Sequence, residues 1–260
     1  MRKKSLKLCG FSCIMGIFGA FLRWLQIQNI FEPDTGLATP NSPWSWAFIA
    51  FVILSASMLI VFVRSFRKSS FPLTYPEIYS GGKFYKTAAI IIGALMALGG
   101  FATIIRTLSS RSVFDLLLGI FSFAGAVSSS SFVISAKKSG SKNAGIAVSV
   151  IIVLFLCFWL ISAYKFSASD PVIWHFAPRI LAISSSVLAF YYVAGFVFGR
   201  PKPLLALYFC QLGAFLSITT LADSYPLGEQ FIVLSFAAFM ELLSFLQVCN
   251  IISGEPSEGD

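Results

Sequence analysis

Two ionisable side chains, Arg23 and Glu241, lie deep within long apolar stretches of the sequence. A charge inside a bilayer is costly, so such groups usually face the interior of a helix bundle or a water-filled path, and often pair with one another. At the rise of an α-helix, their depths from the same membrane face are compatible with contact. The functional interpretation is a site for an anionic substrate or a proton, in which Glu241 titrates and Arg23 is its counter-ion.

Two structural interpretations stand beside this functional one. Arginine is a good bidentate partner for a carboxylate, so the pair would simply join the first and last helices. Alternatively, the long Arg23 side chain extends outward to the membrane surface and leaves Glu241 without it.

Clusters of hydroxyl and small residues within the apolar stretches also admit two interpretations. They would line a polar path, or they would allow close helix packing, which is the more common role of such residues in membranes. The residues concerned are Ser128, Ser129, Ser130 and Ser131, then Ser184, Ser185 and Ser186, then Ser217, Thr219 and Thr220, and the stripe Ala89, Gly93 and Ala97.

The elements that carry these residues are predicted to be membrane-spanning helices. The chain is 57% hydrophobic and only 12% charged, with a mean hydropathy of +0.83, whereas soluble domains contain about 25% charged residues. A bilayer core needs about 20 apolar residues per spanning helix. Backbone groups in hydrocarbon must be satisfied internally, and the stretches have helical length, so each is predicted to be an α-helix. The predicted spans are 8–30, 46–63, 87–105, 113–136, 144–164, 178–198, 204–222 and 229–250.

We therefore predict an all-α polytopic transmembrane helix bundle of about eight spans, forming one domain over residues 1–260 with a short acidic tail at 251–260. The connections are too short for a soluble catalytic or nucleic-acid-binding domain. The net charge of +8 arises from Lys and Arg at helix ends, so the expected partner is the lipid bilayer and not a nucleic acid. The single histidine, the absence of nucleotide-binding and hydrolase motifs, and cysteines without metal-ligand neighbours argue against a cofactor, a metal site or an enzyme.

The distribution of basic residues predicts the orientation of the chain. Short cytoplasmic connections are rich in Lys and Arg, and here the basic residues gather in alternate connections, which places both termini in the cytoplasm of a plasma membrane. The first span follows a basic segment, as in a signal peptide, but residues 17–20 do not supply small residues at both of the positions that cleavage prefers, and the apolar stretch continues to Ile30. We therefore expect this span to remain; cleavage would leave seven spans. The basic residues are Arg2, Lys3, Lys4, Lys7, Arg64, Arg67, Lys68, Lys83, Lys86, Lys137, Lys138, Lys142, Arg200 and Lys202.

The longest cytoplasmic connection, residues 64–86, combines five aromatic residues with flanking Lys and Arg. Such a composition suits a segment that lies on the membrane surface. Docking of a partner is the alternative for this connection.

The stretch from Arg23 to Gln26 and on through Phe31 to Leu37 resembles a segment in a group of uncharacterised bacterial multi-pass membrane proteins. The resemblance covers a small part of the chain and implies a location in a bacterial inner membrane. It implies no activity, ligand or site residue.

Two functional hypotheses follow. In the first, the protein binds or moves a small solute, with Glu241 and Arg23 near the polar site, and a water-accessible cavity reaches them. In the second, it is a structural, regulatory or assembly subunit of a membrane complex, with helices packed throughout.

Overall fold

The structure of the chain is a computed structural model that describes residues 2–31, 37–39, 41–136, 141–168, 170 and 172–251. Within these ranges the chain is helical, with short connections. The helices are α1 (Arg2–Ile30), α2 (Pro43–Arg64), α3 (Tyr75–Tyr79), α4 (Lys83–Ser110), α5 (Val113–Ser135), α6 (Ser141–Ser167), the 3-10 turn η1 (Ile173–His175), α7 (Ala177–Val197), α8 (Pro203–Thr220) and α9 (Leu227–Cys249).

Every predicted span corresponds to a long helix, and in the described part of the chain eight helices are long and apolar enough to cross a membrane. The predicted class, a polytopic helix bundle, is therefore confirmed. The helix ends differ from the predicted ones, because helical hydrogen bonding continues past the apolar residues. The clearest case is α4, which runs from Lys83 to Ser110 where the sequence predicted 87–105. Most of the predicted acidic tail, residues 252–260, lies outside the described residues.

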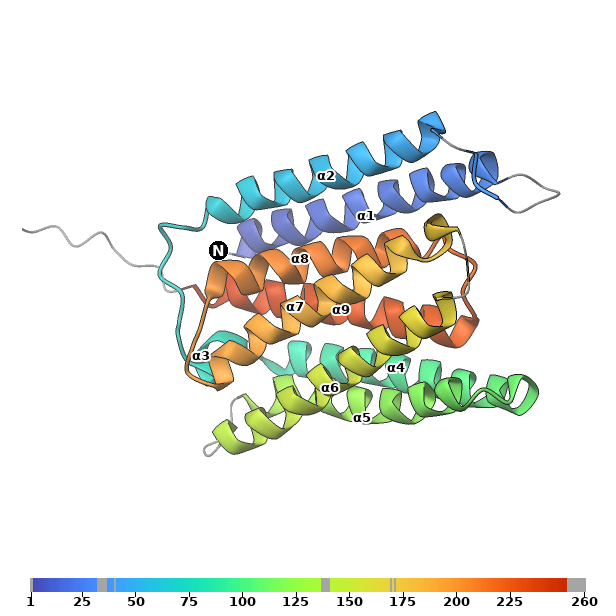
Figure 1. Cartoon of the computed structure of the whole chain (residues 1–260). Helices are drawn as coiled ribbons and strands as arrows, with labels where there is room; N and C mark the ends of the chain where they lie inside the picture. The colour runs from blue at the N-terminus through green and yellow to red at the C-terminus, as the bar shows by residue number, and fades with distance from the viewer. Residues whose placement is uncertain are drawn as a thin grey trace, which may run out of the picture.

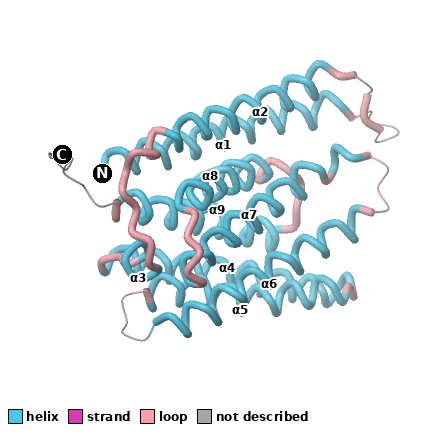
Figure 2. The backbone as a smooth tube through the Cα atoms, turned by 60° about the vertical axis from the view of Figure 1, so that its left-hand side comes forward, coloured by secondary structure: helices cyan, strands magenta, loops and turns pink. Residues whose placement is uncertain are grey.

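The helices form three layers (Figures 1 and 2): α1 with α2, then α7, α8 and α9, then α4, α5 and α6. Helix α9 contacts α1, α4, α7 and α8, so the helix that carries Glu241 lies at the centre of the bundle. Aromatic rings fill the space between layers. For example, the rings of Phe155 on α6 and Phe236 on α9 stack with centroids 5.5 Å apart.

The bundle has two ends, which we name by their residues. The N-terminal end holds the start of α1, the connection between α2 and α4 with α3, the connection between α7 and α8, and the end of α9 (Figure 1). The Trp174 end holds the connections between α1 and α2, α4 and α5, α6 and α7, and α8 and α9.

Small residues bring α4 and α5 into close contact. A Cβ atom at Gly93 would lie 2.8 Å from the carbonyl oxygen of Ala126, so only glycine fits there without displacement. The Ser130 hydroxyl lies 3.0 Å from the carbonyl oxygens of both Ala89 and Ala126. These contacts support the packing interpretation for the stripe on α4 and for this part of the serine cluster.

The composition of the connection between α2 and α4 predicted a segment on the membrane surface. Part of it is instead buried, because α3 packs against the end of α9. Ile78 and Tyr79 are fully buried. Asn250 Nδ2 donates to the carbonyl oxygens of Ile78 and Ser80, each at 2.9 Å, and Gln247 Nε2 lies 2.6 Å from the Tyr79 hydroxyl. Burial raises the pKa of Tyr79, so this phenol remains neutral. Polar side chains at the end of the last span thus fix α3 to the bundle.

Candidate functional site

Glu241 lies on α9, facing the junction of α1 and α8. At 1.5 Å per residue it is about 21 Å from the start of α9 and about 12 Å from its end, well inside the helix. The side chain is half-buried. At this depth a carboxylate costs free energy unless a cation, a proton or hydrogen bonds compensate for its charge.

The hydrogen bonds around Glu241 indicate where a proton lies. The Ser12 hydroxyl of α1 is within hydrogen-bond distance of Glu241 Oε1 and is 2.9 Å from the carbonyl oxygen of Cys9. A serine hydroxyl has one proton, so it donates to only one of these two acceptors. Both contacts are satisfied when Glu241 is protonated, because Glu241 then donates to Ser12 and Ser12 donates to Cys9. The geometry therefore favours the neutral carboxylic acid.

Gln211 of α8 contacts the other carboxyl oxygen. Its Nε2 donates to Glu241 Oε2 at 3.0 Å and lies 3.9 Å from the Cys9 sulfur. The Gln211 side chain is fully buried, and its Oε1 has no hydrogen-bond partner among the described residues. An unpaired buried acceptor costs about 1–3 kcal/mol, so a site that contains one is suited to an added donor.

The groups around Glu241 are neutral. Among the described residues, the acids that form salt bridges with basic side chains are Asp170, Asp223 and Glu229. Cys9 and Cys13 of α1 lie beside Glu241. All three residues are half-buried. The site is thus a carboxyl group with hydroxyl, amide and thiol neighbours, open on one side.

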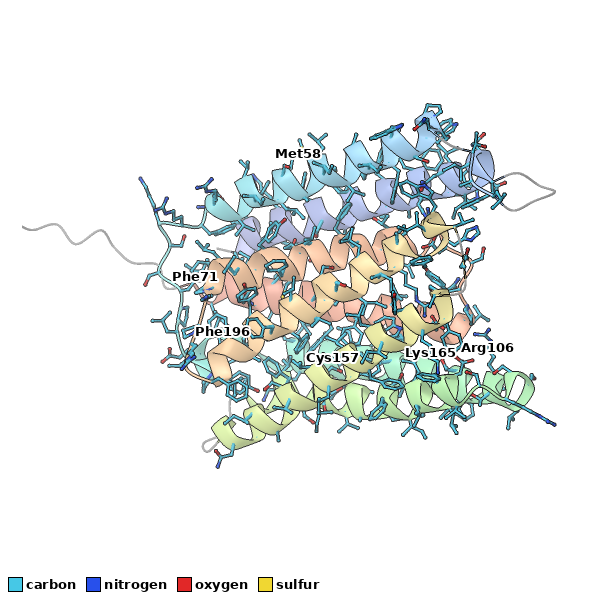
Figure 3. All side chains as sticks on the ribbon, viewed as in Figure 1. Met58, Phe71, Arg106, Cys157, Lys165 and Phe196 are labelled. Carbon is cyan, nitrogen blue, oxygen red and sulfur yellow. The ribbon has the colours of Figure 1, made fainter. Side chains whose placement is uncertain are left out.

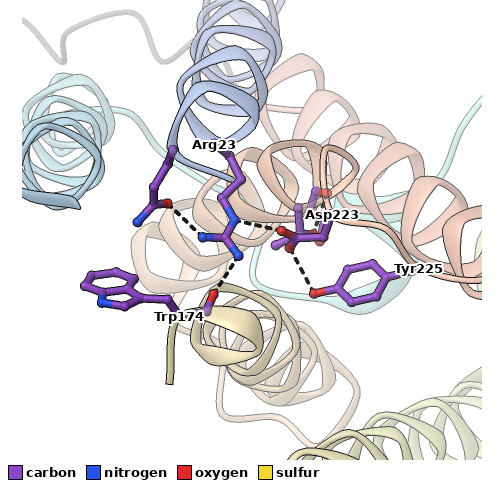
Figure 4. Close-up of polar contacts among 7 residues, drawn as sticks. Arg23, Trp174, Asp223 and Tyr225 are labelled. Atoms are coloured by element: carbon purple, nitrogen blue, oxygen red, sulfur yellow. Dashed lines mark hydrogen bonds and ion pairs between the residues drawn. The ribbon is translucent and has the colours of Figure 1, made fainter. Parts of the chain in front are cut away.

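Arg23 does not pair with Glu241, so the predicted contact between them is wrong. Arg23 Nε lies 2.7 Å from Asp223 Oδ1, and the other two nitrogens donate to Gln26 Oε1 at 2.7 Å and to the carbonyl oxygen of Trp174 at 2.6 Å (Figure 4). Arg23 is about 16 Å along α1 from Ser12, which contacts Glu241. The long side chain extends toward the Trp174 end, as the third interpretation predicted, but there it meets an acid and not water.

The Arg23 contacts continue into a larger buried network. Asp223 is 5% exposed and accepts from the Tyr225 hydroxyl at 2.9 Å. The Tyr225 ring lies under the guanidinium of Arg179, 4.7 Å away, and Arg179 pairs with Glu229. Burial raises the pKa of Asp223, while the charge of Arg23 opposes the shift; burial also raises the pKa of Tyr225. The network ties α1, α7 and α9 together at the Trp174 end.

A cavity of about 170 Å³ adjoins this network. Arg106, Asp115, Arg179 and Glu229 line it, together with two apolar residues. Arg179 is 9% exposed, and its Nε has no hydrogen-bond partner among the described residues. Figure 3 shows Arg106 at this end of the bundle. The volume is sufficient for about five waters at the density of the liquid.

The remaining hydroxyl clusters bond to their own helices. Ser185 and Ser186 donate to the carbonyl oxygen of Ala182 at 2.8 Å, and Thr219 donates to that of Phe215 at 2.9 Å. These contacts favour packing over a polar path. Four cavities within the described part of the chain have linings without Glu241 or Arg23, so the cavity expected by the solute hypothesis is not among these four.

Sequence reasoning missed three of the partners at these sites. Gln211 falls within the predicted span 204–222, and an amide at mid-span is a signal that could have identified it. Asp223 and Glu229 fall at span ends, where an acid gives no sign that it is buried. His175, the single histidine, lies 2.7 Å from Asp170 in the connection before α7.

Neither a search for metal ligands nor a comparison with known proteins assigns a function to these sites. Within the described residues, no group of three or more His, Cys, Asp or Glu side chains is arranged to hold a metal ion. The resemblance at the first connection includes residues 32–36, which lie outside the described residues. No protein-family model, curated protein or solved structure matches this chain.

Proposed function

We propose that this integral membrane protein binds a small solute at the Glu241 site in exchange for a proton, as the binding step of a proton-linked carrier. The observation that carries the proposal is the arrangement of Ser12 between two acceptors, which favours a proton on Glu241 because both contacts are then satisfied. A carboxylic acid at this depth, without a basic partner among the described residues, is a group that can exchange its proton for another cation.

The chemistry of the site defines the class of solute. Loss of the proton leaves a carboxylate next to Gln211, whose Oε1 has no hydrogen-bond partner among the described residues, so the site then offers two acceptors. A small cation or a molecule with N–H donors, such as an alkali ion or an ammonium group, would satisfy both. The half-buried Glu241, Cys9 and Cys13 provide a side from which such a solute enters.

The first test addresses the proton itself. A hydrophobic carbodiimide forms a stable adduct with a protonated carboxyl group, and we expect the protein in liposomes to be labelled at Glu241. Glu241→Gln should remove this adduct, whereas Glu77→Gln should leave it unchanged, because Glu77 is an exposed acid on α3. Labelling is measured by mass spectrometry of the intact chain and its peptides.

The second test addresses exchange. Alkali cations, ammonium and alkylamines are added to proteoliposomes that contain a pH dye, and we expect at least one of them to release protons and to slow carbodiimide labelling. Glu241→Gln should abolish both effects while Glu77→Gln keeps them. Unlabelled wild-type protein, or equal proton release in both variants, would contradict the proposal.

The alternative, a structural or assembly subunit, makes the opposite prediction. It assigns no exchange to Glu241, so substitution there would change only folding yield. The two buried ion pairs at the Trp174 end, Arg23 with Asp223 and Arg179 with Glu229, support this alternative because they join separate helices.

We also propose that the N-terminal end faces the cytoplasm of a bacterial plasma membrane. The concentration of Lys and Arg in the connections of this end supports the orientation. Lys202 should be protected from a membrane-impermeant amine reagent in intact cells and become reactive after permeabilisation. Labelling of Lys202 in intact cells would reverse the orientation.

A further inference from the structure

A lipid-exposed groove of about 690 Å³ lies between α6 and α7, near the N-terminal end. Its walls are apolar: Val150, Val153 and Leu154 of α6 face it, as does Tyr191 of α7. These walls are open, since Leu154 is 62% exposed and Tyr191 is 63% exposed. In a bilayer, such a groove contacts acyl chains.

One mouth of the groove carries two cations, Arg200 and Lys202. The backbone holds them there. Gly199 adopts a positive φ of 74°, and the Arg200 N–H donates to the Gly195 carbonyl oxygen at 2.7 Å, which is the bond that closes a Schellman motif. Pro201 then restricts the chain before Lys202. The backbone of this connection therefore fixes the positions of Arg200 and Lys202 at the groove.

The placement of Lys202 calls for an anion. Lys202 is the N-cap of α8, and the positive end of the helix dipole disfavours a cation at that position. Among the described residues, the three salt bridges involve other basic groups, so neither Arg200 nor Lys202 is paired with a carboxylate. Two exposed, unpaired cations at the head of an apolar groove form a complementary surface for an anionic headgroup with attached chains.

We propose that this groove binds one anionic phospholipid, with its phosphate at Arg200 and Lys202 and an acyl chain along Val150 and Leu154. A soluble phosphate ester would use only the mouth, and a zwitterionic lipid would bring a positive group to two cations. The combination of charge and apolar wall selects the anionic lipid. The site is separate from Glu241 and does not rest on the function proposed for it.

The experiment measures lipid retention by native mass spectrometry on the full chain in detergent, titrated with phosphatidylglycerol or phosphatidylcholine. We expect phosphatidylglycerol to bind at lower concentration than phosphatidylcholine. Arg200→Gln with Lys202→Gln should raise the half-saturating phosphatidylglycerol concentration about 30-fold, at about fivefold per charge. The matched control is Lys83→Gln with Lys86→Gln, which removes two cations from α4 outside the groove; it should leave that concentration within about twofold.

A second variant tests the groove without touching the charges. Val150→Trp fills the wall and should reduce phosphatidylglycerol binding, whereas Ile161→Trp introduces the same side chain at an exposed position of α6 outside the lining. Glycerol phosphate should not compete for the lipid. Equal retention of both lipids, unchanged binding in the Arg200 and Lys202 variant, or full competition by glycerol phosphate would each overturn the proposal. If the charge variant fails to fold, the Val150 and Ile161 pair decides the question.

Discussion

Replacement of Asp223 by Asn should destabilise the protein strongly, because it removes the charge partner of a buried guanidinium. Arg23 is 1% exposed, and Asp223 is the acid paired with it; the two other contacts of its guanidinium are to neutral oxygens. Removal of one member of a buried ion pair costs about 3–5 kcal/mol. The Asn oxygen still accepts from Arg23, so we expect a loss of about 3 kcal/mol, at the lower end. The measurement is the free energy of unfolding in mixed micelles, followed by tryptophan fluorescence.

The double variant separates the cost of an unpaired charge from the value of the pair. Arg23→Met with Asp223→Asn should recover about 2 kcal/mol of the loss, because no buried charge remains. The control is Asp170→Asn, an acid in an exposed ion pair, which should cost less than about 1 kcal/mol. If Asp223→Asn costs less than about 1 kcal/mol, or if the double variant is no more stable than the single one, the buried pair does not stabilise the bundle in this way.

Three further predictions concern other parts of the fold. Gly93→Ala should destabilise the bundle by about 1–3 kcal/mol, because its Cβ would lie 2.8 Å from a carbonyl oxygen of α5, whereas Gly10→Ala, with open space around it, should be neutral in the same unfolding assay. Asn250→Ala removes two hydrogen bonds to the backbone around α3 and should increase the rate of proteolysis before α4. The Val172 N–H donates to the Asp170 carboxylate at 2.8 Å and lowers the pKa of Asp170. The turn should therefore keep its full stability above pH 3.8, the pKa of Asp170 in the unfolded chain, and lose it as the pH falls through the lower pKa of the folded state. Hydrogen exchange of residues 172–176 measures this, and Asp170→Asn should remove the pH dependence.

The class of the fold could be predicted because one interaction dominates it. An apolar stretch of spanning length can satisfy its backbone hydrogen bonds in a bilayer in few ways other than as an α-helix, so the sequence predicted all eight long helices of the described chain. Helix ends could not be placed from hydropathy, since α4 continues through Arg106 and Thr107 to Ser110, beyond the end predicted at residue 105. The packing of α3 on α9 depends on Asn250 and Gln247, whose partners are distant in sequence.

The candidate site was predicted in part. Glu241 was identified because a carboxyl group within a span is rare, but its partners were not. Ser12 looks like an ordinary packing residue in the sequence, and the mid-span amide of Gln211 gives a signal without naming its partner. Arg23 was assigned to Glu241 on depth alone. The structure instead pairs it with Asp223, because an arginine side chain extends several ångströms along the helix from its own Cα and because the connection after α8 places Asp223 against α1. Neither effect is visible in residue spacing.

The charge state of Glu241 can be decided by a change at its neighbour. Gln211→Met keeps the length of the side chain, removes the bond to Glu241 Oε2 and also removes the unpaired Oε1. If Glu241 is a neutral acid, the lost bond is worth about 1 kcal/mol and the removal of the buried acceptor offsets it, so the free energy of unfolding should change by less than about 1 kcal/mol. If Glu241 is a carboxylate, the lost bond is charge-assisted and the buried charge has one donor fewer, so the cost should exceed about 2 kcal/mol. The same variant should lose solute-driven proton release, because Oε1 of Gln211 is the acceptor that the solute is proposed to meet. Stability without release would place Gln211 in the binding site, whereas a large loss of stability would refute the protonated state on which the exchange depends.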